Sequence, residues 1–111
     1  MRRITFAMLV LDRAHFDHMT AGDRALQIEV LGLFRQQVEA WRARLASGDG
    51  WREAAHTLKG SARGIGLNAL AAACEAAEGT PEAERLTALS DVHRALSAAL
   101  GELERFAADA A

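Results

Sequence analysis

The chain has 111 residues, of which half are hydrophobic, and its formal net charge is -2. This length fits a single domain, and the absence of a basic excess argues against a nucleic-acid partner. The only cysteine, Cys74, excludes an internal disulfide and suits a reducing, cytoplasmic environment. Ala, Leu, Arg and Glu are abundant and β-branched residues are few, a composition that favours helices.

The chain begins with an apolar run over residues 4–11, which follows Arg2 and Arg3. A signal peptide can begin in this way, but no cleavage site with small residues follows the run. The run is also too short to cross a bilayer. We therefore expect a core-packing or partly frayed N-terminus, no membrane association and a cytoplasmic location.

Helix breakers divide the chain into five predicted helical segments. These segments cover residues 12–19, 24–46, 51–65, 69–78 and 82–108. Asp49 is expected to cap the third segment and Asn68 the fourth, while Gly66 and Gly79 end these two segments. Pro81 suits the first turn of the last segment.

Apolar residues recur at helical spacing in the long segments, as in helices that face a shared core. In the second segment they are Leu26, Val30, Leu33, Phe34, Val38, Trp41 and Leu45. In the last segment Leu86, Leu89, Leu96, Leu100 and Leu103 follow this spacing, and His93 among them is expected to be a core-edge histidine with a hydrogen-bond partner. We predict an all-α fold, an antiparallel up-down four-helix bundle with a short extra N-terminal helix, as one domain over residues 1–111.

The third segment departs from this pattern at one histidine. Residues placed about 100° apart on a helix put an apolar stripe toward the core and His56 on the opposite, exposed side. Arg52, Lys59 and Arg63 surround His56 on that side. Neutral imidazole is a nitrogen nucleophile near neutral pH, and basic side chains stabilise the charge of a phosphoryl group. The face is therefore a candidate site for phosphoryl transfer.

Two glycines share this face. Gly60 and Gly64 each cost roughly 0.8–1 kcal/mol relative to alanine inside a helix, and core packing does not require them. Side chains lean toward the helix N-terminus, so a side chain at Gly60 is expected to crowd the imidazole of His56. The glycines therefore indicate a flat surface for the approach of another protein or a phosphate.

Residues 56–66 (HTLKGSARGIG) resemble the signature of histidine-containing phosphotransfer (HPt) domains, which reads His-x-Leu-Lys-Gly followed by small residues, a hydrophobic residue and glycine. A weaker similarity extends along the chain through the loop at 20–23 and the aromatic Phe34. It continues in the following helix with Leu70, Cys74, Glu75 and Glu78. The resemblance implies a four-helix bundle whose histidine carries phosphate between aspartates on the receiver domains of response regulators.

The resemblance also implies roles for individual residues. His56 is expected to be phosphorylated on Nε2, Lys59 to neutralise the phosphoryl group and Gly60 to admit the receiver. The expected partner-binding residues are Arg52, Arg63, Gly64 and Gln37, the last as a hydrogen-bond donor to the imidazole or the phosphate. Expected partners are response-regulator receiver domains and a hybrid histidine kinase, and the chain is expected to be a monomer.

The chain has no glycine-rich nucleotide loop and no acidic cluster for Mg²⁺. We therefore expect a phosphocarrier that does not phosphorylate itself from ATP and is not an enzyme. No cofactor or metal is expected in this chain, and Mg²⁺ is expected only in the partner receiver.

Other interpretations stay open. The same exposed face could serve a docking or dimerisation module without chemistry, or two chains could form a dimeric bundle as in histidine kinases. An enzyme that uses His56 as a general base has little support, because no carboxylate is evidently placed to orient the imidazole. His15 and His18 lie three residues apart, but two histidines do not make a structural zinc site, and we expect them to be surface residues. Cys74 is expected to be a buried small hydrophobic residue.

Overall fold

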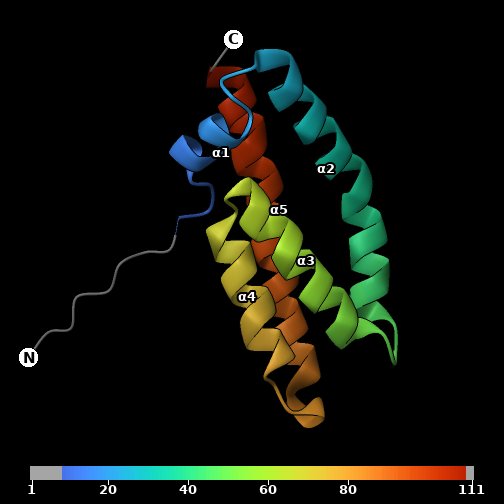
Figure 1. Cartoon of the computed structure of the whole chain (residues 1–111). Helices are drawn as coiled ribbons and strands as arrows, with labels where there is room; N and C mark the ends of the chain where they lie inside the picture. Colours follow the sequence, from blue (N-terminus) through green and yellow to red (C-terminus); the bar gives the residue numbers. More distant parts are fainter. Residues whose placement is uncertain (1–8, 110–111) are drawn as a thin grey trace, which may run out of the picture.

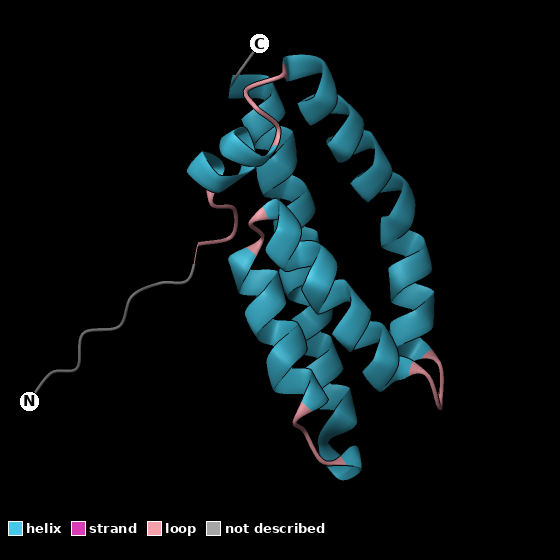
Figure 2. Ribbon diagram, viewed as in Figure 1, coloured by secondary structure: helices cyan, strands magenta, loops and turns pink. Residues whose placement is uncertain are grey.

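The computed structural model describes residues 9–109, and every regular element in this range is helical (Figure 2). The elements are α1 (Arg13–Met19), α2 (Arg24–Ala46), α3 (Trp51–Ile65), α4 (Asn68–Glu78), the short 3₁₀ helix η1 (Glu82–Glu84) and α5 (Arg85–Asp109). The predicted all-α class is confirmed. The first four segments agree with the prediction to within one residue, and the fifth is divided into η1 and α5.

The four long helices pack in the order in which they occur in the chain. Each of α2, α3 and α4 packs against the helix that follows it, and α5 also packs against α2. Figure 1 shows that the chain reverses direction at each connecting loop. A single apolar core, which includes residues from Phe16 in α1 to Leu103 in α5, holds the helices together.

The core stripe of α2 differs from the predicted one. Phe34, Val38 and Trp41 are buried as expected, but Leu33 is 51% exposed and Leu26 is also exposed. Successive residues of a helix lie about 100° apart, so Leu33 and Phe34 cannot both face the centre of the core. The buried stripe follows the Phe34 side of the helix and includes Leu31, which was not predicted, as well as the predicted Leu45.

The prediction for the start of α5 was wrong as well. Leu86 is 78% exposed, whereas Leu89 and Leu96 are buried. Leu86 lies in the first turn of α5, where this helix follows η1 at one end of the molecule (Figure 1). The apolar repeat in the sequence therefore begins one turn before the part of α5 that packs against other helices on that side.

Two of the predicted caps were wrong. Gly50, not Asp49, precedes α3, and Leu67 precedes α4, so that Asn68 is already the first helical residue; neither cap residue makes a side-chain hydrogen bond. Leu67 is fully buried in the tight turn after Gly66. This apolar side chain therefore occupies the position where a polar capping residue would stand. Gly66 ends α3 as predicted, in the left-handed conformation at φ +95°.

The segment around α1 closes the C-terminal end of α3. The backbone N–H of Asp12 donates to the carbonyl of Gly66 at 2.8 Å, and Nε2 of His15 lies 3.1 Å from the carbonyl oxygen of Gly64. These contacts satisfy carbonyls that have no donor within the helix. His15 and His18 are exposed, and no cluster of three or more potential metal ligands occurs within residues 9–109.

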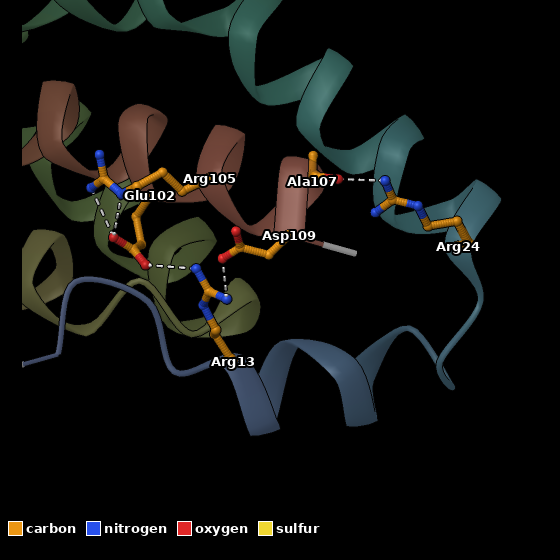
Figure 3. Close-up of polar contacts among 6 residues, drawn as sticks. All are labelled: Arg13, Arg24, Glu102, Arg105, Ala107 and Asp109. Carbon is orange, nitrogen blue, oxygen red and sulfur yellow. Dashed lines mark hydrogen bonds and ion pairs between the residues drawn. The ribbon is translucent and has the colours of Figure 1, made fainter. Parts of the chain in front are cut away.

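The same segment is tied to the end of α5 (Figure 3). The guanidinium of Arg13 lies 2.9 Å from Oδ2 of Asp109 and 3.2 Å from Oε1 of Glu102. Arg24, in the first turn of α2, donates to the carbonyl of Ala107. The N-terminal helix therefore connects the ends of α3 and α5.

Two titratable groups lie inside or at the edge of the core. Cys74 is a fully buried core residue, as predicted, and burial raises the pKa of its thiol to about 12. His93 is half-buried, with Nδ1 3.3 Å from Nη1 of Arg42. Burial and the positive charge of Arg42 lower the pKa of His93. His93 is thus the core-edge histidine that the sequence predicts, with a hydrogen-bond partner.

Part of the expectation for the N-terminal run lies outside the described residues, since residues 4–8 are not among them. Within the described part of the run, Leu11 is buried and Leu9 is exposed. None of the helices between residues 9 and 109 combines the length and the apolar character that a bilayer span requires.

Gly66→Ala is expected to lower the free energy of unfolding by about 1–3 kcal/mol, because a side chain is strained at this positive φ. Its β-carbon would also lie 3.0 Å from Cδ2 of His15 and 3.2 Å from the carbonyl oxygen of Asp12. Chemical denaturation measures the loss. Gly48→Ala is the control, since its β-carbon would meet no atom within 4 Å. Equal losses in the two variants would contradict the explanation.

Candidate functional site

The candidate site is centred on His56, in the middle of α3. The buried face of this helix includes Ala54, Ala55, Leu58 and Ala62, all with no exposed surface. His56 points away from that face, and its side chain is 68% exposed. A histidine on the outside of a well-packed helix has a fixed backbone and an imidazole that another protein can reach.

A carboxylate holds this imidazole. Oε1 of Glu78, the last residue of α4, lies 2.8 Å from Nδ1 of His56, and Oε2 of Glu78 lies 2.7 Å from Nζ of Lys59. The expectation that no carboxylate orients His56 was therefore wrong. Glu78 is 22 residues away along the chain, and only the packing of α4 against α3 brings it to the site. The sequence places both Glu75 and Glu78 in the fourth predicted helix. Nothing in the local sequence distinguishes the glutamate that reaches His56 from the other.

Glu78 is charged at neutral pH. The ammonium of Lys59 has the largest effect and holds the pKa of this carboxyl below its usual value, against the opposing effect of burial; His56 lowers it further. The side chains of Glu78 and Lys59 are only 21% and 15% exposed. Oε2 of Glu78 is buried and makes no hydrogen bond apart from this ion pair with Lys59. The pair is thus partly shielded from solvent.

The contact with Glu78 selects one form of the neutral imidazole. A carboxylate accepts hydrogen bonds only, so Nδ1 of His56 carries the proton and its N–H donates a hydrogen bond to Glu78. The lone pair of the neutral ring then lies on Nε2. The geometry therefore presents Nε2, on an exposed side chain, as the nucleophile.

The basic residues around His56 are all paired with α4. Lys59 contacts Glu78 rather than standing free, and Nη2 of Arg63 lies 2.6 Å from Oε1 of Glu75. Nη1 of Arg52 donates to the backbone carbonyls of Glu78 and Thr80. The structure thus brings all three basic residues close to the site, and their contact with a partner stays a prediction.

Gly60 and Gly64 lie beside His56 on open surface. Apart from the neighbouring residues and the backbone of α3 itself, a β-carbon at either position would meet no atom within 4 Å. We expected a side chain at Gly60 to crowd His56. For the β-carbon of such a side chain, this expectation is wrong. Among the described residues, no packing contact requires a glycine at either position.

Gln37 makes no hydrogen bond to the imidazole of His56 in the described structure. It lines a groove of about 260 Å³ between α2 and α3, and the hydrogen-bond partner of the His56 Nδ1 is Glu78 instead. The groove is mostly apolar. Its lining consists of Met19, Val30, Leu33, Phe34, Gln37, Trp41, Ser61 and Ile65. Leu33, which the sequence placed in the core, is exposed because it lines this groove.

The glycines connect His56 to the groove. With about 100° per residue, Gly60 and Gly64 lie roughly 40° and 80° around α3 from His56, on the same side as Ser61 at roughly 140°. Ser61 lines the groove. The continuous surface from His56 across the two glycines to the α2–α3 groove is called the docking face below.

Lys59→Met is expected to lower the free energy of unfolding by about 0.5–1.5 kcal/mol at neutral pH, because Oε2 of Glu78 is left without a partner. The lowered pKa of Glu78 fixes the sign of the pH dependence. The stabilisation is present above the ordinary value of 4.5 and is lost as the pH falls through the lowered pKa. Denaturation at a series of pH values measures it.

The matched control is Arg63→Met, which removes an exposed ion pair between the same two helices. This change is expected to cost less than about 0.5 kcal/mol. A loss for Lys59→Met that equals that of the control, or that is unchanged in acid, would contradict the assigned role of the Lys59–Glu78 pair.

Comparison with known protein families finds one match. The Hpt domain model matches residues 29–106, a range that includes every residue of the His56–Glu78–Lys59 cluster. No curated protein and no solved structure matches the chain significantly. Hpt domains are helical bundles that act as phosphocarriers rather than as catalysts. Since the match covers more than half of the chain, and its exposed histidine lies on a helix packed into such a bundle, the protein belongs to the Hpt domain family of two-component phosphotransfer.

Proposed function

We propose that this chain accepts a phosphoryl group on Nε2 of His56 from the phospho-aspartate of a receiver domain, alone or within a hybrid kinase. His56 then passes the group to an aspartate of a response regulator. The observation that carries the proposal is the contact of 2.8 Å between Nδ1 of His56 and Glu78, which leaves Nε2 as the nucleophile of an exposed imidazole.

The transfer needs no base on this chain. The Nε2 lone pair attacks phosphorus, an N–P bond forms, the P–O bond to the aspartate breaks and the aspartate leaves as a carboxylate. The ring keeps its proton on Nδ1 and gains positive charge, which the carboxylate of Glu78 stabilises at 2.8 Å. The reverse sequence returns the phosphoryl group to an aspartate.

Lys59 has two acceptors in this scheme. In the free protein its ammonium pairs with Glu78. After transfer, the phosphoryl oxygens on His56 add negative charge one helical turn away, and Lys59 offsets part of that charge. Arg63, whose side chain is more than half exposed, is the further cation available to the phosphate or the partner. Mg²⁺ belongs to the receiver in this proposal.

The docking face is proposed as the surface that receives the partner. Gly60 and Gly64 allow the receiver backbone to approach the imidazole, and the groove with Gln37 takes apolar side chains of the receiver. Arg52 borders the other side of His56. We propose that a single chain binds the partner, so that the protein acts as a monomer. Its helices α2 to α5 form an up-down bundle within a single domain over residues 1–111.

His56→Gln is expected to abolish phosphate loading from an aspartyl-phosphorylated receiver, because glutamine lacks the nucleophilic nitrogen. Acid-labile, alkali-stable phosphate on the wild-type chain, and none on the variant, is the expected result. Receiver binding by the variant should remain within about threefold, since the rest of the face is intact. If binding occurs but no receiver or kinase loads the wild type, the chain is a docking module without chemistry.

Leu33→Asp is expected to weaken receiver binding by roughly tenfold, because it places a charge where apolar surface is buried in the complex. Leu86→Asp is the matched control, since Leu86 is an exposed leucine that does not line the groove. Titration calorimetry with the receiver compares the two. Equal affinities would exclude the groove from the interface.

A further inference from the structure

Arg52 makes an unusual set of contacts for an exposed arginine. It lies on α3 one turn before His56, and its Nη1 donates to the carbonyl of Glu78 and, at 3.1 Å, to that of Thr80. Its guanidinium carbon also lies 4.3 Å from the centre of the Trp51 ring. The ring is buried, so it gives the guanidinium a rigid support. The guanidinium of Arg52 is thus held against the turn that ends α4.

His56 and Lys59 of α3 contact the carboxylate of Glu78, but few contacts from α3 reach the backbone of this turn. The last carbonyls of a helix have no donor within the helix, and a positive charge at this end is favourable. Gly79, the residue after α4, is exposed and has no side chain to anchor it. The one additional link from the start of α3 is the indole N–H of Trp51, which donates to Oε1 of Glu82 at 3.3 Å. Arg52 is therefore the main connection between α3 and the backbone at residues 78–80.

The backbone that Arg52 holds belongs to the residue that holds His56. The guanidinium binds the carbonyl of Glu78, and the carboxylate of the same residue accepts from Nδ1 of His56. A shift of this last turn would move the carboxylate away from the imidazole. Hydrogen bonds are sensitive to displacements of a few tenths of an ångström.

We infer that Arg52 is a positioning residue for phosphoryl transfer, which fixes the end of α4 so that Glu78 keeps the His56 proton on Nδ1 and the lone pair on Nε2. The inference rests on the proposed role of His56 as the phosphate acceptor. It differs from a direct contact of Arg52 with phosphate, because it predicts a change in the imidazole before any phosphate or partner is present.

The test compares wild type, Arg52→Ala, Arg52→Lys and Arg63→Ala by ¹⁵N NMR of the neutral His56 imidazole, without a partner. Arg63→Ala is the matched control, because Arg63 pairs α3 with α4 through Glu75 and does not contact the Glu78 backbone. Phosphate loading from an aspartyl-phosphorylated receiver is measured on the same four proteins, and circular dichroism checks that each one is folded.

Wild type and Arg63→Ala are expected to show the Nδ1–H form. Arg52→Ala is expected to show a mixture with the Nε2–H form and to load phosphate roughly two- to tenfold more slowly, the factor that one hydrogen bond contributes. Arg52→Lys is expected to recover part of both effects, because an ammonium can donate to the same carbonyls. If Arg52→Ala does not fold, Arg52→Lys carries the test, with an intermediate tautomer mixture expected.

An unchanged tautomer in Arg52→Ala overturns the inference, even if loading is slower, since that result assigns Arg52 to the phosphate or the partner. An equal change of the tautomer in Arg63→Ala also overturns it, because the effect is then a general loosening of the two helices; slower loading alone in Arg63→Ala reflects the proposed contact of Arg63 with the phosphate or the partner. If wild type accepts no phosphate from any receiver, the proposed function fails, whereas the tautomer comparison still decides whether Arg52 positions Glu78.

Discussion

The contacts of the Glu78 carboxylate are the interaction on which the proposed chemistry of this molecule depends. It accepts from Nδ1 of His56 and pairs with Nζ of Lys59, so one side chain of α4 organises two side chains of α3. The carboxylate is partly shielded, and the adjacent ammonium keeps it ionised. Neither His56 nor Lys59 could take up this arrangement on an isolated helix. The packing of α3 against α4 is therefore the structural condition for a histidine with a defined nucleophilic nitrogen.

The surface around His56 contains features that are unfavourable for the isolated chain. Glycines in a helix reduce stability, and an exposed leucine contributes no stabilising burial; here Gly60, Gly64 and Leu33 lie on one face. No contact within the described residues accounts for Gly60 or Gly64. A partner that approaches His56 closely and buries the groove accounts for all three residues together, which is why the proposed function assigns them to one docking face.

The rest of the fold keeps this site rigid. Wide burial along α3 fixes the backbone under His56, and the contacts of Asp12 and His15 with Gly66 and Gly64 close the far end of the helix. Arg52 acts at the opposite end, on the carbonyls that follow α4. In the proposed function, the chain contributes a preorganised acceptor, and the metal and most of the catalysis belong to its partner.

Local sequence determined the helices, since helix breakers such as Gly66 and the apolar spacing act within a few residues. It also determined that His56 is exposed while Ala54 and Leu58 are buried. Tertiary structure decided the rest. Periodicity could not distinguish a leucine of the core from one that lines a groove, as Leu33 does, because both fit the same stripe. The Glu78 contact could not be predicted either, because it depends on how α4 lies along α3, and a carboxylate in the next helix can face solvent or the site with the same local sequence.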